Sequence, residues 1–118
     1  MTTPVETFDA LDEWASRADD ATRQGAQAFA RLLKLAEERN SGQILRVARF
    51  IAAAYNGESF PFDPFELRAV DVAISDDMLC CLDALRWGRA DLHTLVPDGD
   101  VRVRAVIERW CLRWPEDA

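Results

Sequence analysis

One histidine and three cysteines are the candidates for acid–base, nucleophilic or metal chemistry in this sequence. A cysteine nucleophile needs a base and a group that orients the base. In this sequence the nucleophile could be Cys80 or Cys111, with His93 as the base and Asp91 as the orienting group. No glycine-rich turn surrounds either cysteine, and helix interiors are expected there. Zinc sites need more histidines and thiolates, and the adjacent Cys81 points away from Cys80 on a helix. The thiols are therefore predicted to be structural, and no metal or cofactor is expected.

Acidic side chains are the most abundant candidates for a binding site. Carboxylates that serve a glycosidase or a di-metal centre converge from separate elements, whereas these acids follow one another along expected helices. The net charge of −7 disfavours loose binding to phosphate backbones and favours a partner with a basic surface. The acids predicted to meet lysine and arginine on a protein partner are Asp9, Asp12, Glu13, Asp19, Asp20, Glu66, Asp76 and Asp77.

Basic side chains are concentrated in residues 21–57, which hold six bases and two acids. Arginine clusters position phosphate groups, so a nucleic-acid-binding accessory protein is the alternative function. The overall charge opposes that function, and the same bases can pair with acids of residues 1–20 and 58–83, which hold six and seven acids. The bases concerned are Arg23, Arg31, Lys34, Arg39, Arg46 and Arg49.

Aromatic residues form the most individual segment of the chain, with Tyr55, Phe60, Phe62 and Phe65 close together. These rings either close the core beneath a loop or form a patch at a partner interface, where aromatic residues often act as hot spots. Trp14 and Trp114 lie near the two ends and are expected to be partly exposed. A homodimer through the tryptophans is left open.

Helical periodicity predicts how the first half of the chain holds these side chains. Apolar residues recur every three or four positions in a first helix, at Phe8, Leu11, Ala15 and Ala18. A second helix is predicted over residues 22–39, followed by a break at Asn40, Ser41 and Gly42. Asn40 or Ser41 can cap a third helix that continues to Tyr55. The short connection predicts that the second and third helices form an antiparallel hairpin.

The second half of the chain is also predicted to be helical. Asp63, Pro64 and Glu66 supply a cap, a proline at the first helical position and an acid in the first turn. The apolar period then continues to residue 87, as one helix or as two with a restart at Asp71 or Ser75. A last helix is predicted over residues 100–113, with Cys111 on its buried face and Trp114 and Pro115 beyond it.

These patterns predict an all-α fold, a single compact bundle of about five helices. We expect residues 1–7 to be a flexible N-terminal end and residues 8–115 to be one helical domain, a normal size for a domain. No apolar run approaches the roughly 20 residues that span a bilayer. No signal peptide is evident, and unpaired thiols indicate a cytoplasmic location. The predicted core is Phe29, Leu32, Leu33, Val47, Ile51, Leu67, Val70, Ile74, Met78, Leu82, Val106, Ile107 and Trp110.

Residues 29–112 resemble an uncharacterised family of short proteins encoded on proteobacterial plasmids, integrative elements and prophages. The sequence departs from that family at residues 64–66, where Pro-Phe-Glu replaces Leu-Thr-Asp. The family has no established activity, so the resemblance supplies a setting and no catalytic residues. The matching positions are Leu32-Leu33, Gly42-Gln43, Arg46-Val47-Ala48-Arg49-Phe50, Tyr55-Asn56, Phe62-Asp63, Leu67, Val70-Asp71, Ile74 and Asp77-Met78-Leu79.

The function predicted from the sequence is non-catalytic protein binding through an acidic surface. The mobile-element setting implied by the resemblance suggests inhibition of a host defence complex, in the manner of anti-CRISPR proteins. Direct binding of nucleic acid and a small cysteine hydrolase are the second and third hypotheses. Neither membrane binding nor a cofactor is expected.

Overall fold

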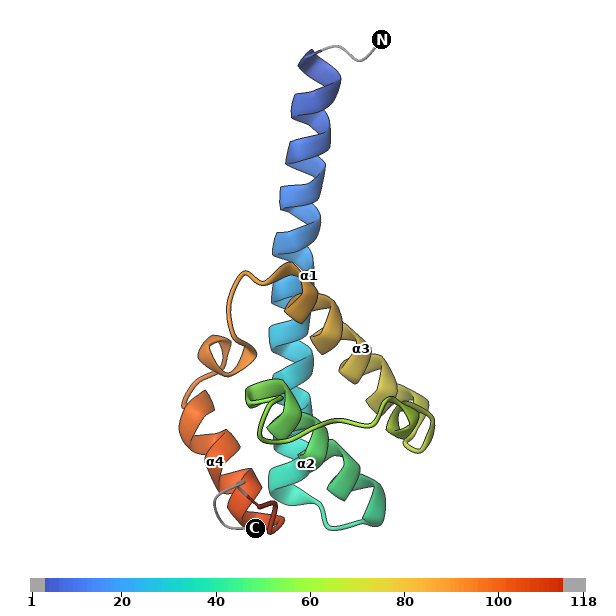
Figure 1. Cartoon of the computed structure of the whole chain (residues 1–118), viewed down its shortest axis with the longest axis vertical. Coiled ribbons are helices and arrows are strands. Elements are labelled where there is room, and N and C mark those ends of the chain that lie inside the picture. The colour runs from blue at the N-terminus through green and yellow to red at the C-terminus, as the bar shows by residue number, and fades with distance from the viewer. Residues whose placement is uncertain (1–3, 114–118) are drawn as a thin grey trace.

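The computed structural model describes residues 4–113 of the chain, with side chains described from residue 10 onward. Its elements are α1 (Pro4–Glu38), α2 (Gly42–Tyr55), the 3-10 helix η1 (Pro64–Arg68), α3 (Val72–Trp87), the 3-10 helix η2 (Leu92–Leu95) and α4 (Gly99–Arg109). No strand occurs in the described range, so the predicted all-α class is confirmed. The described part holds four α-helices and two short 3-10 helices rather than five longer helices (Figure 1).

A single helix, α1, replaces the first two predicted helices and contains 35 residues. The separation predicted near residues 19–22 is wrong, because the polar residues there lie on a solvated face and do not interrupt the backbone. Gly25 also stays within the helix, where it allows close packing against Ala84 of α3. The helix begins at Pro4, inside the segment 1–7 that was expected to be flexible, and proline suits the first turn of a helix.

The long helix α1 and α3 run antiparallel and form the main helix pair of the fold (Figure 1). Arg17 lies over the ring of Trp87, at the end of α3, whereas Arg31 binds Asp77 nearer its beginning. Between these contacts, the Cys81 thiol donates to the carbonyl oxygen of Gly25 at 3.8 Å. The residues of α1 before Arg17 extend past the end of α3, because α3 ends at Trp87 and the chain turns away from α1 at Gly88.

The predicted hairpin of the second and third helices is present as the C-terminal half of α1 and α2. The signal at residues 63–66 also begins a helix where expected, and the Asp63 side chain accepts a hydrogen bond from the Phe65 backbone. That helix is the short η1, and a new helix starts after Asp71. The sequence left open whether this segment forms one helix or two. It forms two, and the second begins after Asp71.

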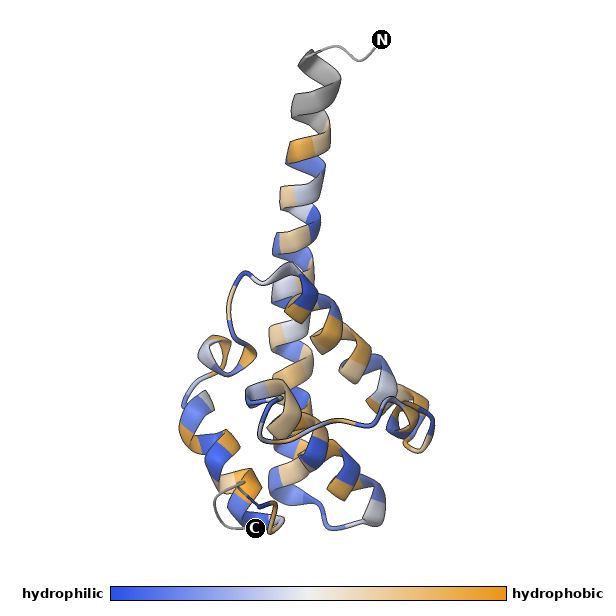
Figure 2. Ribbon diagram, viewed as in Figure 1, coloured by the Kyte–Doolittle hydropathy of each residue, from blue (hydrophilic) through white to orange (hydrophobic). Residues whose placement is uncertain are grey.

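The predicted core is largely confirmed, with most of its members fully buried between α1, α2, α3 and α4. The prediction that Leu82 belongs to the core is wrong, because its side chain is 37% exposed and the adjacent Cys81 is buried instead. Leu67, Val70 and Trp110 are only partly buried against this core. Figure 2 shows hydrophobic positions along the inward faces of the helices and also on the projecting half of α1.

The last helix, α4, ends at Arg109 and is shorter than predicted. Cys111 follows the helix with a φ of 57° and is exposed, so its assignment to a buried helix face is wrong. Trp110 anchors this end by donating from its indole Nε1 to the Ala36 carbonyl at 2.8 Å. Trp114 and Pro115 lie outside the described residues. No helix within residues 4–113 combines the length and apolarity that crossing a membrane requires.

Candidate functional site

The N-terminal part of α1, residues 4–17, projects from the rest of the molecule and is called the arm here (Figure 1). The molecule measures 56 Å along its longest axis and 29 Å and 24 Å across. Side chains 10–17 are all exposed, whereas Ala18, the next residue, is 2% exposed. The helical body therefore ends near Ala18, and the arm is a helix whose described side chains lie in solvent.

The arm carries an apolar stripe that the rest of the molecule leaves uncovered. Leu11 and Trp14 are 54% and 58% exposed, large values for side chains of this kind. Alternating steps of three and four residues keep one face of a helix apolar, and this spacing continues from the arm into the buried part of α1. The positions are Leu11, Trp14, Ala18, Ala21, Gly25, Ala28 and Leu32. The same face of α1 is thus buried in the body and exposed on the arm.

Four of the predicted site acids are exposed around this stripe. Asp12 and Glu13 lie on the arm, and neither forms an ion pair within the described residues. Asp19 binds Arg89 at 3.0 Å and Asp20 binds Arg23 at 2.7 Å, where the arm meets the body. These two pairs are exposed and therefore contribute little to stability. Asp9 belongs to α1, but its side chain lies outside the described residues.

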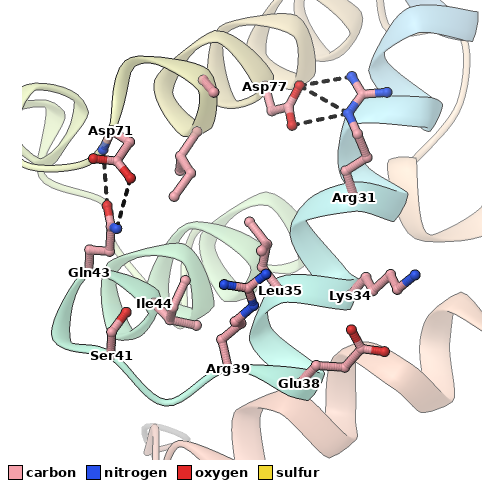
Figure 3. Close-up of a pocket in the computed structure, with 12 residues that line it drawn as sticks. Arg31, Lys34, Leu35, Glu38, Arg39, Ser41, Gln43, Ile44, Asp71 and Asp77 are labelled. Atoms are coloured by element: carbon pink, nitrogen blue, oxygen red, sulfur yellow. Dashed lines mark hydrogen bonds and ion pairs between the residues drawn. The ribbon is translucent and has the colours of Figure 1, made fainter.

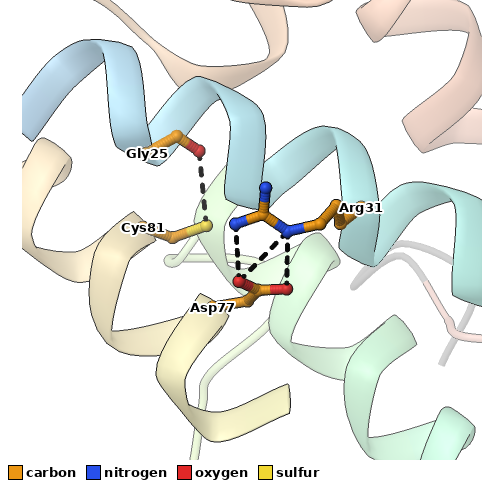
Figure 4. A network of polar contacts seen from close by, with 4 residues as sticks. All are labelled: Gly25, Arg31, Asp77 and Cys81. Carbon is orange, nitrogen blue, oxygen red and sulfur yellow. Dashed lines mark hydrogen bonds and ion pairs between the residues drawn. The ribbon is translucent and has the colours of Figure 1, made fainter. Parts of the chain in front are cut away.

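Two other predicted site acids are bound within the molecule. Glu66 is only 9% exposed, and its Oε1 accepts from Arg46 and Arg49 at 3.3 Å and 3.2 Å. The Asp77 carboxylate receives Nη2 of Arg31 at 2.8 Å and its Nε at 3.1 Å, a bidentate pair that joins α1 to α3 (Figure 4). Glu66 and Asp77 therefore hold elements together through arginines of the chain.

Asp76, the remaining predicted site acid, is exposed on α3 and has no ion pair within residues 4–113. It lies on the body, far along α1 from the arm, because the neighbouring Asp77 pairs with Arg31. The structure thus brings Asp12, Glu13, Asp19 and Asp20 together on and beside the arm and leaves Asp76 apart. The exposed apolar pair Leu11 and Trp14 is the part of this surface that the sequence hypothesis did not include.

The basic residues of the alternative hypothesis are largely neutralised. Arg23, Arg31, Arg46 and Arg49 all bind carboxylates of the chain, as the sequence analysis anticipated for residues 1–20 and 58–83. Within the described residues, Lys34 and Arg39 are the two members of this set without an ion pair. These two cations, on a chain with a net charge of −7, make a weak interface for phosphate backbones.

The cysteines and His93 do not form a nucleophilic pair within residues 4–113. Burial raises the pKa of the Cys81 thiol to about 12, and the nearby Asp77 carboxylate acts in the same direction. Cys80 is half-buried and Cys111 is exposed. His93 instead packs its ring edge against Tyr55, with centroids 4.8 Å apart, and its Nδ1 is buried without a hydrogen bond. No group of three metal-ligating side chains occurs among the residues described.

Tyr55 takes part in a polar contact that sequence spacing could not indicate. Its hydroxyl donates to Asp100, which lies 45 positions along the chain at the start of α4. This hydrogen bond raises the pKa of Tyr55 and lowers the pKa of Asp100, because it favours the neutral phenol and the charged carboxylate. Arg104 also binds Asp100 at 3.1 Å. The contact ties α2 to α4 at the surface.

The aromatic segment that follows Tyr55 divides between the two roles considered for it. Phe60 is buried, and Phe62 packs edge-on against Phe50 with ring centroids 5.2 Å apart. Phe65 is exposed, and the guanidinium of Arg68 lies 4.9 Å from its ring centroid. The first two rings close the core beneath the loop between α2 and η1, whereas Phe65 remains at the surface.

Comparison with known proteins identifies one family that includes this chain. A search of curated proteins and a search of solved structures each gave no significant match. The model of DUF7673, a family of unknown function, matches residues 26–111, which include most of the helical body and exclude the arm. The resemblance to an uncharacterised family is thereby confirmed at the level of the family. The chain belongs to the family of unknown function DUF7673.

Proposed function

We propose that this protein is a non-catalytic binding module whose arm docks as a helix in an apolar groove bordered by lysine and arginine on another protein. The observation that carries the proposal is the uncovered continuation of the α1 stripe at Leu11 and Trp14. Amphipathic helices commonly bind in this way, with anchors at intervals of three and four residues. Asp12 and Glu13 would face the basic border of such a groove.

The geometry of the arm favours tight docking for its size. Tryptophan is the residue type most enriched among interface hot spots, and truncation of one commonly costs about 2 kcal/mol or more. The helix is already formed as part of α1, so binding does not need to order a disordered segment. Preorganisation of this kind leaves more of the contact energy available as affinity.

Charge determines which kind of partner fits the arm. Asp12 and Glu13 have no ion pair within the described residues and are within two positions of Trp14 in the sequence. A second copy of the chain would bring the same carboxylates against the first set, and two like charges 4 Å apart repel by about 1 kcal/mol even in water. A lysine or arginine of a basic partner at the same distance would instead be attracted to these carboxylates by a similar energy. The charges therefore favour a different protein with lysine and arginine over self-association of the arm.

We also propose a setting for this interaction. Proteins of the kind described for the sequence resemblance come from plasmids, integrative elements and prophages, and small acidic proteins of such elements often block host machinery. A nucleic-acid-handling defence complex in the bacterial cytoplasm would present the basic surface that the arm requires. This part of the proposal is an analogy of context and rests on no single residue.

Site-specific photocrosslinking in a bacterial host tests where the partner binds. A photoreactive phenylalanine analogue replaces Trp14 in one variant and Leu79 in another, because Leu79 on α3 is 52% exposed and serves as a matched control. We expect the first variant to crosslink one protein through a peptide rich in lysine and arginine. Equal crosslinking from both positions, a crosslink to a second copy of the chain, or no crosslink at all would contradict the proposal.

Affinity measurements with the crosslinked protein, once purified, test the two components of the interface. Trp14→Ser should weaken binding by about 30-fold or more, whereas Leu79→Ser should leave it unchanged. Asp12→Lys combined with Glu13→Lys should slow association and flatten its dependence on salt, since rim charges act mainly on the association rate. Asp76→Lys on α3 is the charge control. If Asp76→Lys has the larger effect, the arm is not the binding surface.

A further inference from the structure

A groove of about 460 Å³ lies between the C-terminal half of α1, the start of α2 and the start of α3 (Figure 3). Two polar bridges join the helices beside it. Gln43 donates to the Asp71 carboxylate and accepts from the Asp71 backbone, each at 3.0 Å, and Arg31 binds Asp77 farther along α3. The groove therefore has fixed sides and a volume within the range of small-molecule sites.

The interior of the groove is mostly apolar. Its lining includes Leu35 from α1, Ile44 from α2 and Ala73 and Ile74 from α3. Ile44 and Ile74 are buried members of the core, so the lining is backed by close-packed residues. An apolar lining on rigid elements suits the body of a small organic ligand and gives little reason for binding a bare inorganic ion.

Two cationic side chains at the groove have no carboxylate partner within the described residues. Lys34 and Arg39 line it, and neither has an ion pair within residues 4–113. The acids of α3 that line it are already engaged, since Arg31 binds Asp77 and Gln43 binds Asp71. In Figure 3 the Arg39 guanidinium extends over the interior beside Leu35. The unused polar capacity on the α1 side is therefore mainly cationic.

Two acids oppose an anion at this groove. Glu38 also lines it, has no ion pair within the described residues and lies next to Arg39 in the chain. Asp71 is the second such acid, because its partner Gln43 is neutral and leaves the charge of the carboxylate unbalanced, so the two unpaired cations are matched in number by two acids. Ser41 adds a hydroxyl to the lining, and its side chain makes no capping hydrogen bond to α2.

From these observations we infer that the groove binds a small organic molecule with an apolar body and a carboxylate or phosphate head. The body lies against Leu35, Ile44 and Ile74, and the anionic head is bound by Lys34 and Arg39. This site is separate from the arm, because Arg17 and Lys34 are 17 positions apart on one helix, or about 25 Å at 1.5 Å per residue. The inference is independent of the proposed function, and either can fail alone.

Direct binding measurements with a matched set of probes test the inference. The probes are 4-phenylbutyrate, 4-phenylbutylphosphate, 4-phenylbutanol and 4-phenylbutylamine, which share one apolar body and differ in the head. We expect both anions to bind in the groove at least about 10-fold more tightly than the alcohol and the amine, as for charged hydrogen bonds. Comparing the carboxylate with the phosphate shows which head the cations prefer. Backbone amide shifts in NMR spectra should map the site to Ile44, Ala73 and Ile74.

Three variants distinguish recognition of the head from nonspecific binding. Lys34→Ala with Arg39→Ala should weaken binding of the anions by about 10-fold and leave binding of the alcohol unchanged. Glu38→Gln removes one of the two opposing charges and should tighten binding of the anions by about threefold at low salt. Arg68→Ala is the control, because Arg68 also lacks an ion pair within the described residues and is not part of the groove lining.

Four results would overturn the inference. Equal affinity for 4-phenylbutanol and 4-phenylbutyrate would show that the cations do not recognise the head. Amide shifts centred on another surface, or no binding of either anion at 10 mM, would show that the groove is not a site for this class of ligand (about −2.7 kcal/mol at that concentration). Weaker anion binding in the Glu38→Gln variant would contradict the assigned charge balance.

Discussion

At the scale of single residues, the carboxylates of this protein have two different roles that their sequence context does not distinguish. Glu66 and Asp77 are held by arginines and join elements, whereas Asp12 and Glu13 have no ion pair within the described range. The sequence predicted all of them as a solvated surface. The partners of Glu66 and Asp77 lie between 17 and 46 positions away, so no local pattern could reveal the pairing.

Glu66→Gln is predicted to lower the free energy of unfolding by about 1–2 kcal/mol. The substitution leaves two arginines without their shared carboxylate, although their partial exposure limits the loss through solvent screening. Urea denaturation followed by circular dichroism measures the effect. Asp76→Asn, at an exposed acid without an ion pair in the described range, should change stability by less than 0.5 kcal/mol. Equal effects of the two substitutions would show that Glu66 does not stabilise the fold.

Alkylation with iodoacetamide at pH 8 is predicted to modify Cys111 much faster than Cys81. Burial raises the pKa of Cys81 to about 12, so only about one molecule in ten thousand carries the thiolate at that pH. The stabilisation from keeping this thiol neutral is fully present below about pH 9 and is lost as pH rises toward 12. Mass spectrometry of the modified peptides gives the rates. Rapid labelling of Cys81 in the folded protein would contradict its burial.

At the scale of elements, the fold depends on the close approach of α1 and α3. A Cβ atom built on Gly25 would lie 2.4 Å from the Cβ of Ala84 and 3.1 Å from the Cys80 carbonyl oxygen. Glycine is normally unfavourable within a helix, and here the packing requires it. The sequence indicated the helices, the hairpin, the cap at Asp63 and, as one of the alternatives, the restart at Asp71. It did not indicate the continuity of α1, since residues 19–22 resemble a helix boundary until α3 is seen to pack beside them.

Gly25→Ala is predicted to destabilise the protein by about 1–3 kcal/mol, because the added methyl group overpacks the contact with α3. The same substitution in an exposed helix would stabilise by about 1 kcal/mol. The double variant with Ala84→Gly removes the facing methyl group and should recover part of the loss. Gly42→Ala is the control, since a Cβ there meets nothing within 4 Å. Thermal unfolding checks the series, and a stabilised Gly25→Ala variant would contradict the packing.

At the scale of the whole molecule, the body and the arm differ in what stabilises them. The family match covers residues 26–111, and the buried core lies within the same part of the chain together with Ala18 and Ala21. The described side chains of the arm are exposed, and Arg17 contacts Trp87 at its base. A short isolated helix is marginal in water. The arm is therefore a helix that is supported mainly by its continuation into the body.

Hydrogen exchange is predicted to divide α1 into two parts. Amides of the arm should exchange within seconds to minutes through local opening, whereas amides near Leu32 should exchange only on global unfolding. Removal of residues 1–17 should leave the cooperative unfolding of the body in place. Exchange measured by mass spectrometry and calorimetry of the shortened chain test the two statements. Equal protection along α1, or loss of folding after the removal, would show that the arm is part of the core structure.

Gly88 determines how much of α1 stays bare. It ends α3 in the left-handed conformation, with a φ of 64°, and the following chain turns toward η2 and α4. Because the chain turns away at Gly88, α3 does not cover the side chains of residues 10–17, which stay exposed. At 1.5 Å per residue, the arm of residues 4–17 offers about 21 Å of helix to the partner proposed above.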